Sequence, residues 1–195
     1  MLKWLFLFLF LLPLAGASFN CTVIGALPYT ISSAGYYCIN RSLSSVTATD
    51  LSGAVTINAD NVIFDCQGSA ISGTATLDKH GIYFNGTTLS SAKNCRVSLF
   101  DFGVFLDNSK NATISNITSD SNEEGFVVEA NGSIIGNSSA LGNNGNGFLI
   151  ELYSYENLIA NSTSSLNTLD GYAISLSSRN FIFNSFASNN SAGFS

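Results

Sequence analysis

From residue 81 onward, a glycine recurs at a nearly constant spacing, and each but the last directly precedes an apolar-x-apolar triplet. These glycines are Gly81, Gly103, Gly125, Gly147, Gly171 and Gly193. They are separated by 22, 22, 22, 24 and 22 residues. A second phrase, Ile-x-Asn-x followed by Thr, Ser or Phe, recurs in step with them, at Ile114, Ile135, Ile159 and Ile182. Self-similarity at a period of this length is the signature of a protein whose units stack on one another.

Within each unit, apolar and polar residues alternate over three to five positions, which is the period of a strand with one buried face. The chain contains 22 Asn and 30 Ser, residues that favour turns and compete with the helix backbone. We therefore predict an all-β fold, a single-stranded right-handed parallel β-helix with coils of about 22 residues and three short strands per coil. Leucine-rich repeats carry a different, Leu-rich phrase, and hexapeptide helices have a shorter period.

The first 17 residues read as a targeting segment. Lys3 precedes an apolar stretch from Trp4 to Leu14, and the small residues Ala15, Gly16 and Ala17 follow. This order is typical of a secretory signal peptide cleaved after Ala17, and the stretch is shorter than the roughly 20 residues that a spanning helix needs. We expect a secreted or cell-surface protein with no membrane span in the mature chain.

Three regions follow from these patterns. We expect the signal peptide at 1–17, a lead-in or cap region at 18–52, and β-helix repeats at 53–195. The chain stops two residues after Gly193, inside a new coil. Because an uncapped solenoid end exposes strand edges and core, the repeat looks truncated, and we expect further coils or a partner at this end.

Export changes how the four cysteines are interpreted, because an oxidising compartment favours disulfides. The cysteines are Cys21, Cys38, Cys66 and Cys95, and four cysteines allow three pairings. Proximity in the sequence favours Cys21 with Cys38 and Cys66 with Cys95. The chain has no C-x-x-C spacing, which argues against a zinc site.

A family resemblance supports the predicted fold. Residues 53–73, GAVTINADNVIFDCQGSAISG, and the later GIYFNG with its Asn- and Ser-rich coils resemble the NosD-like group of exported parallel β-helix proteins. The preceding YTISSAGYYCIN resembles the lead-in strand pair of that group, so the resemblance covers about residues 29–195. It implies the fold and leaves the activity open, because the same solenoid carries lyases, epimerases, hydrolases and adhesins. Copper delivery would call for Met and His, yet the only Met is Met1.

The alternation also predicts which residues face inward. Those directly after the glycines form a core column, and the next residues form a partly aromatic outward stripe. The stripe consists of Tyr83, Phe105, Val127 and Leu149. We interpret it as a candidate sugar-binding surface, because sugar rings stack on aromatic faces. The alternative is that outward strand positions simply favour aromatic and branched residues.

Beside this stripe, a second outward column places three carboxylates on successive rungs, at Asp107, Glu129 and Glu151, with Asn85 at its end. Like charges on neighbouring rungs, about 4.8 Å apart, repel one another. Calcium binds carboxylate and carbonyl oxygens in loose geometry. We expect weak calcium binding at Asp107, Glu129 and Glu151, bridging to an acidic glycan; the alternative is an ordinary solvated acidic face.

The Asn of the second phrase is predicted to point inward and to stack as a ladder of amides. The ladder would contain Asn94, Asn116, Asn137, Asn161 and Asn184. Three of these Asn lie in N-x-(S/T) sequences, where burial would make them poor glycan acceptors. Asn85, Asn111 and Asn131 lie at strand exits or turns and are the better candidates for glycosylation.

Composition and charge narrow the classes of function that the chain can have. Seven Lys and Arg against 13 Asp and Glu argue against nucleic acid as a partner. No convergent cluster of basic side chains is evident, and the adjacent Glu123 and Glu124 would point apart, so we assign no catalytic residue. We expect a non-catalytic exported scaffold or glycan-binding module, with a polysaccharide or surface glycan as partner and no cofactor except calcium. The alternative is a polysaccharide lyase or epimerase-type enzyme whose catalytic coils are partly missing.

Overall fold

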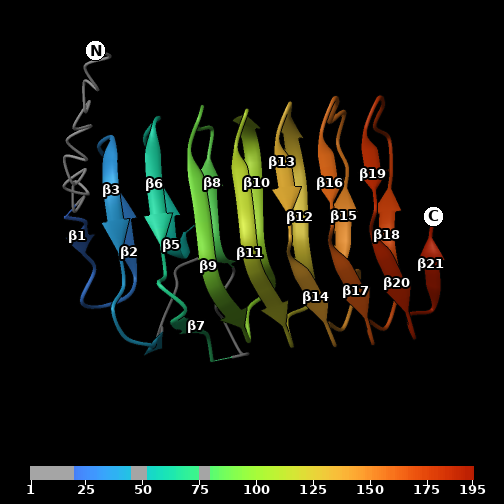
Figure 1. The fold of residues 1–195 in the computed structure, drawn as a ribbon, viewed down its shortest axis with the longest axis horizontal. Coiled ribbons are helices and arrows are strands. Elements are labelled where there is room, and N and C mark those ends of the chain that lie inside the picture. The colour runs from blue at the N-terminus through green and yellow to red at the C-terminus, as the bar shows by residue number, and fades with distance from the viewer. Residues whose placement is uncertain (1–19, 45–51, 75–79) are drawn as a thin grey trace, which may run out of the picture.

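In the computed structural model, residues 20–44, 52–74 and 80–195 are described, and within these ranges the chain forms strands and no helix. All strands pair in parallel, in two sheets that run the length of a solenoid (Figure 1). This confirms the predicted all-β parallel solenoid. The predicted signal peptide, 1–17, lies outside the described residues.

The first sheet has eight strands and takes one strand from each coil. In order, they are β2 (Tyr29–Ile31), β5 (Gly53–Ile57), β8 (His80–Asn85), β10 (Phe102–Lys110), β12 (Glu124–Asn131), β15 (Phe148–Ile150), β18 (Asp170–Ile174) and β21 (Ala192–Phe194). Strands β2 and β3 (Gly35–Cys38) lie where the sequence resembles a lead-in strand pair.

The second sheet has thirteen strands and bends, so that later coils contribute two short strands each. Its main path is β1 (Thr22–Val23), β3 (Gly35–Cys38), β6 (Val62–Asp65), β9 (Ser91–Ser98), β11 (Thr113–Asp120), β13 (Ile134–Gly136), β16 (Leu158–Ala160) and β19 (Phe181–Phe183). Beside it lie β4 (Leu43–Ser44), β7 (Ala70–Ser72), β14 (Ser139–Leu141), β17 (Thr163–Ser165) and β20 (Phe186–Ser188).

The register confirms the 22-residue step and the inward column. Ile82 pairs with Val104, which pairs with Phe126, and the column continues to Phe148 and Tyr172. All five side chains are at most 1% exposed. The rings of Phe126 and Phe148 stack with their centroids 4.6 Å apart, and those of Phe148 and Tyr172 at 4.9 Å. Burying each such side chain contributes about 1.5–3 kcal/mol to the free energy of folding. Because the side chains of one coil are covered by those of the next, each coil is stabilised chiefly by its neighbours.

The recurring glycine is explained by the close approach of successive rungs. A Cβ atom at Gly147 would lie 2.8 Å from the carbonyl oxygen of Gly171 and 2.8 Å from Nδ2 of Asn167. At Gly171 the corresponding distances, to Gly193 and Asn190, are 2.8 and 2.7 Å. Real Cβ atoms do not come this close to backbone, so only glycine fits where the turn meets the first sheet.

Both predicted disulfides are present, Cys21–Cys38 and Cys66–Cys95, and the described residues contain no free cysteine. The second bond joins consecutive rungs, because Cys66 directly follows β6 and Cys95 lies in the middle of β9. These bonds tie the first coils of the solenoid together.

The predicted inward amide ladder is wrong in its position. Asn116, Asn137, Asn161 and Asn184 are exposed, and their backbone φ values of 46–54° place them in left-handed turns. Such a turn breaks the strand alternation and directs the side chain outward, where Asn116 Nδ2 still donates to Asn94 Oδ1 at 2.8 Å. These Asn are therefore accessible, contrary to the expectation that burial makes them poor glycan acceptors.

The buried ladder lies instead at the next turn, in Asn122, Asn143, Asn167 and Asn190. The first three are at most 3% exposed. The backbone N–H of Asn122 donates to Oδ1 of Asn143 at 3.0 Å, and that of Asn143 donates to Oδ1 of Asn167 at 2.9 Å. Each amide thus satisfies a backbone donor of the preceding coil, which no water reaches.

We expect Asn143→Ala to lower the melting temperature, because the change leaves the backbone N–H of Asn122 buried without an acceptor. The loss should be about 1–3 kcal/mol, and each kcal/mol corresponds to roughly 2–4 °C in a protein of this size. The matched control is Asn144→Ala, which removes the same side chain at an exposed neighbouring position. Equal melting temperatures for the two variants would contradict the ladder.

Candidate functional site

The predicted outward stripe exists as a column but does not face solvent. Tyr83, Phe105, Val127 and Leu149 are in register on β8, β10, β12 and β15. However, Tyr83 and Phe105 are only 8% exposed and Val127 is 1% exposed, while Leu149 is half-buried. The rings of Tyr83 and Phe105 stack at 5.5 Å. The expectation of an exposed sugar platform here is therefore wrong, because the side chains cover one another's faces.

Tyr83, Phe105 and Val127 form a small apolar cluster separate from the core, with Phe102 packed against it. The imidazole of His80 belongs to the same cluster, since its ring centroid lies 5.2 Å from that of Phe102 and 4.9 Å from that of Tyr83. The cluster holds the outward face of the first sheet together.

The acidic column lies beside this cluster, as predicted. Asn85 pairs with Asp107 and Asp107 with Glu129, and the backbone N–H of Glu151 donates to Val128 O, which brings Glu151 next to Glu129. Tyr83 Oη donates to Asp107 Oδ2 at 2.7 Å. Burial, followed by the charges of Asp107 and Glu151, raises the pKa of Glu129.

No three His, Cys, Asp or Glu side chains of the described ranges gather in a way that could hold a metal ion. The acidic column is thus an array of neighbouring, mutually repelling carboxylates and not a preformed cage. Calcium binding at Asp107, Glu129 and Glu151 stays a prediction.

A polar cavity of about 190 Å³ lies beyond the column, at the corner where the first sheet ends. We call it the corner pocket, and it is lined by Lys110, Asn111, Asn131, Gly132, Tyr155 and Glu156. Lys110 and Asn131 are the last residues of β10 and β12, the strands that carry Asp107 and Glu129. Acidic column and corner pocket therefore follow one another along the same strands.

The turn that closes the corner pocket is longer than the corresponding turns on both sides. Leu158 follows Ile150 by eight residues, whereas the paired positions are six residues apart in the preceding coil and seven in the following one, and this coil is the one with the 24-residue spacing. Relative to the preceding coil, the extra residues are Leu152 and Tyr153, and both have positive φ, at 54° and 63°. As a result Tyr153 is 80% exposed, and Tyr155 is 44% exposed at the edge of the corner pocket. The repeat pattern did not predict these tyrosines, although the irregular spacing marked their position.

The three favoured glycan acceptors differ in their surroundings. Asn85 and Asn111 are exposed. Asn131 is half-buried, and its Oδ1 accepts the backbone N–H of Tyr155 at 3.0 Å. Its side chain therefore holds the corner pocket together. Glycosylation of Asn85, Asn111 and Asn131 stays a prediction.

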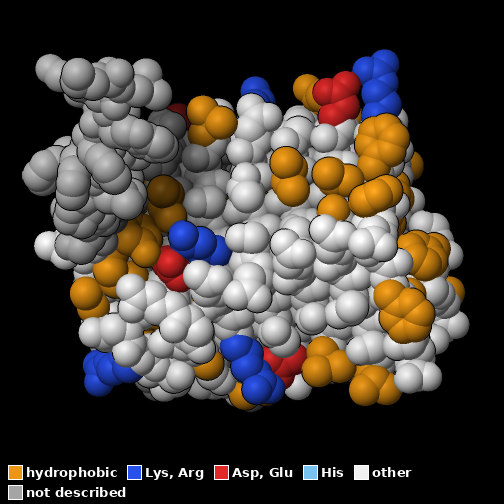
Figure 2. Space-filling view, viewed as in Figure 1, with side chains coloured by type: hydrophobic (Ala, Val, Ile, Leu, Met, Phe, Trp, Pro, Cys, Tyr) orange, Lys and Arg blue, Asp and Glu red, His pale blue; other side chains and the backbone are white. Residues whose placement is uncertain are grey.

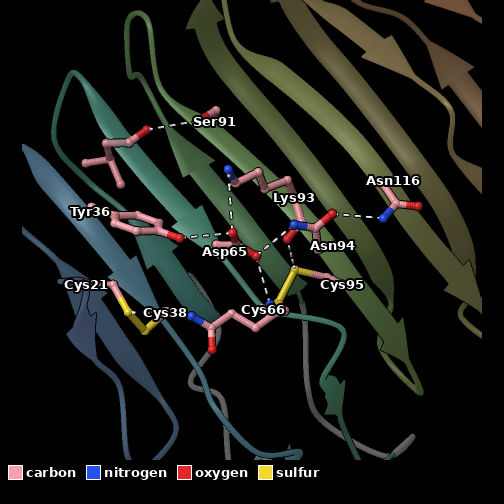
Figure 3. A network of polar contacts seen from close by, with 12 residues as sticks. Cys21, Tyr36, Cys38, Asp65, Cys66, Ser91, Lys93, Asn94, Cys95 and Asn116 are labelled. Atoms are coloured by element: carbon pink, nitrogen blue, oxygen red, sulfur yellow. Dashed lines mark hydrogen bonds and ion pairs between the residues drawn. A yellow bond between two sulfur atoms is a disulfide. The ribbon is translucent and has the colours of Figure 1, made fainter. Parts of the chain in front are cut away.

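A third polar cluster centres on Asp65, on the second sheet (Figure 3). Its carboxylate accepts hydrogen bonds from Tyr36 Oη at 3.1 Å and Asn94 Nδ2 at 2.9 Å, and Lys93 Nζ lies 3.5 Å away. Burial raises the pKa of Asp65, but the hydrogen bonds from Asn94, Gln67 N–H and Tyr36, together with Lys93, outweigh it, so the pKa is lowered. A carboxylate with this many partners clamps three rungs together and is not a reactive acid.

The outward face of the second sheet is mostly uncharged (Figure 2). Hydrophobic side chains gather on it towards the C-terminal end, over β19 and β20 (Figure 2). Phe181, Phe183 and Phe186 are 64%, 67% and 65% exposed there.

The sequence matches the family model described as periplasmic copper-binding protein (NosD) over residues 22–195. The chain belongs to the NosD family. Its residues do not fit a copper site, however. His80 is packed among aromatic rings, the four cysteines are paired in disulfides, and no metal-binding group occurs in the described ranges.

Solved structures share the fold of this NosD-family chain at low sequence identity. The Dettilon tailspike protein aligns with a TM-score of 0.70 at 14% identity, over 89% of this chain and 38% of that one. The Agl-KA catalytic domain has a TM-score of 0.52 at 14% identity, over 83% and 40%. The catalytic domain of a GH87 alpha-1,3-glucanase, D1069A in complex with tetrasaccharides, has a TM-score of 0.52 at 19% identity, over 80% and 34%.

This chain thus spans less than half the length of these three structures. A comparison with curated proteins found no match. Within the described ranges, no helix is long and apolar enough to cross a membrane.

We expect Glu129→Gln to raise the melting temperature near pH 7. Because the pKa of Glu129 is raised in the folded state, folding favours its protonated form, and stability falls as the pH rises through that pKa. The neutral Gln escapes this loss, a gain of about 1 kcal/mol after solvent screening, or roughly 2–4 °C. The gain should shrink as the pH approaches 4.

The control is Glu123→Gln, at an exposed carboxylate outside the acidic column, for which no such gain is expected. A gain that is the same at pH 4 and pH 7 would contradict the repulsion.

Melting curves of the wild-type protein and the Glu129→Gln variant can also test calcium binding. Millimolar calcium should stabilise the wild-type protein and not the Glu129→Gln variant.

Proposed function

We propose that this NosD-family chain is an exported β-helix module that binds a polysaccharide. The observation that carries the proposal is the pair of exposed tyrosines, Tyr153 and Tyr155, on the longer turn beside the corner pocket. A tyrosine offers an apolar ring face and a polar tip. Next to amide and charged side chains, such rings suit sugars, which present both C–H faces and hydroxyl groups.

The shape of the solenoid supports an extended ligand. Corresponding residues of successive rungs lie about 4.8 Å apart, so the corner forms a continuous surface along several coils, as solenoids generally provide. The GH87 alpha-1,3-glucanase with the same fold was solved in complex with tetrasaccharides. For that enzyme the ligand is a saccharide, and we carry the ligand class to this chain as part of the proposal.

Export is the second part of the proposal. The signal-peptide pattern of residues 1–17 supports it, and so do two disulfides, which persist in oxidising compartments. The matched family is described as periplasmic. We propose that the mature protein acts outside the cytoplasm, either secreted or at the cell surface, as a scaffold that holds a glycan.

We expect Tyr153→Ala to weaken polysaccharide binding about 2–10-fold, since one aromatic contact is worth about 0.5–1.5 kcal/mol. Affinity electrophoresis of the mature protein through gels that each contain one polysaccharide measures the effect. Tyr29→Ala is the matched control, because Tyr29 is 36% exposed on β2 at the other end of the solenoid. Retardation that is unchanged in Tyr153→Ala, or lost equally in Tyr29→Ala, would contradict the proposal.

A hydrolase is the second candidate, and one observation favours it. Glu129 has a raised pKa, as a general acid needs, and lies between carboxylates of the two adjacent rungs. Glycosidases place two carboxyl groups about 5–5.5 Å apart in retaining enzymes and about 6.5–9.5 Å apart in inverting ones. Corresponding backbone positions on neighbouring and next-neighbouring rungs are separated by distances of this order.

An assay for new reducing ends, run on each polysaccharide that the protein retards, tests this second candidate. If Glu129 is the acid, the wild-type protein releases reducing ends and Glu129→Gln does not, while Glu123→Gln keeps the activity. Binding without any release would rule the hydrolase out and leave the binding module in place.

A further inference from the structure

The corner pocket is held open by its backbone. Gly132 has a φ of 65°, and a Cβ atom there would lie 2.6 Å from Oδ1 of Asn111. The backbone N–H of Gly132 donates to Tyr155 O at 3.0 Å, and that of Asn111 donates to Asn131 O at 2.9 Å. Three successive rungs are therefore bonded around the space that a side chain at position 132 would fill.

The charges around the corner pocket are unequal. The carboxylate of Glu156 is already paired, with Arg179 Nη1 3.3 Å from its Oε1. Lys110 is exposed, and in the described part of the chain no carboxylate lies within ion-pair distance of its ammonium group. When Arg179 is counted with the lining residues, the region holds two cations and one carboxylate, so one positive charge, that of Lys110, has no counter-ion.

The amides add donors to this charge. Because Oδ1 of Asn131 accepts the N–H of Tyr155, the orientation of that carboxamide is fixed and its Nδ2 is left to donate. A lysine ammonium and an amide N–H₂ are groups that bind anionic oxygens, and hydrogen bonds to a charged acceptor are about twice as strong as neutral ones.

We infer that the corner pocket binds an anionic substituent, a carboxylate or a sulfate, of one sugar residue of the polysaccharide, with Lys110 as its counter-charge. The inference rests on the proposed function and names the class of glycan. At about 190 Å³, the corner pocket lies below the roughly 300–1,000 Å³ of common ligand sites, which suits a single sugar unit. Tyr155 at its edge provides the apolar contact for the ring.

The acidic column does not cancel this preference. A β-bulge between Asp107 and Ser109, with Asn108 at a φ of 47°, separates Asp107 from Lys110 on β10. Both carboxylate oxygens of Asp107 are already hydrogen-bonded, to Tyr83 Oη and Asn108 Nδ2. An anion in the corner pocket would contact the ammonium group of Lys110 directly, and the resulting charge-assisted hydrogen bond is the stronger interaction.

The experiment measures binding of the mature protein to two matched pairs of polymers at physiological ionic strength. Polygalacturonate is compared with its methyl ester, and dextran sulfate with dextran, so that the two arms separate carboxylate from sulfate. EDTA is present throughout, which removes any calcium bridge at the acidic column. We expect the wild-type protein to bind the charged member of at least one pair about tenfold more tightly.

Lys110→Gln should bring the two members of that pair to equal affinity, whereas Lys110→Arg should keep the preference. Arg41→Gln is the matched control, since Arg41 is an exposed cation near the opposite end of the solenoid, where it donates to Gly25 O. Its loss changes the net charge equally and should leave the preference intact. Melting curves of the variants verify that they are folded.

A preference for the charged polymer that survives in Lys110→Gln, or falls equally in Arg41→Gln, would overturn the inference. Binding of neutral polymers alone would also overturn it while leaving the proposed function standing. If the wild-type protein bound no polysaccharide of a broad panel, the proposed function and the inference would fall together.

Discussion

The solenoid depends on hydrogen bonds that run from the backbone of one coil to a side chain of the next. At each tight turn a backbone N–H points along the solenoid axis, away from water, and would be orphaned in an isolated coil. Asn143 and Asn167 supply the acceptors at one corner, and Ser138 and Ser162 do so at another, where their Oγ atoms accept from Ile117 and Ser138 N–H. No coil is therefore complete without its successor, which explains why Asn and Ser dominate the composition.

The period of the sequence predicted the fold because the period is itself imposed by this stacking. Glycine is required wherever the turn meets the next rung, as at Gly147, so its spacing measures the coil length directly. The inward column followed from strand alternation, which holds within β8, β10 and β12. Alternation fails at turns, where a left-handed residue such as Asn137 reverses the direction of the side chain. The sequence therefore indicated that an amide ladder exists but assigned it to the wrong asparagines.

Exposure was harder to predict than register. Alternation correctly put Tyr83 and Phe105 on the outward side of the first sheet, but whether an outward ring is accessible depends on its neighbours. Rungs about 4.8 Å apart bring large rings into mutual contact, and these rings cluster with His80 and Phe102. The carboxylates of the next column could be placed correctly, because charged side chains at the sheet edge remain partly solvated and follow the backbone register.

The location of the candidate site follows from the same constraint. The rungs cannot change without breaking hydrogen bonds on both sides, whereas a turn can lengthen outward if the bonds around it are kept. At the longer turn, Tyr153 N–H still donates to Leu176 O, and Ser154 Oγ still accepts the N–H of Ala130. Leu152 and Tyr153 are thus added without disturbing the ladder, and the turn gains exposed aromatic surface. A solenoid is held together by its rungs. Extra residues at a turn leave those rungs intact, so a binding surface can arise there at little cost in stability.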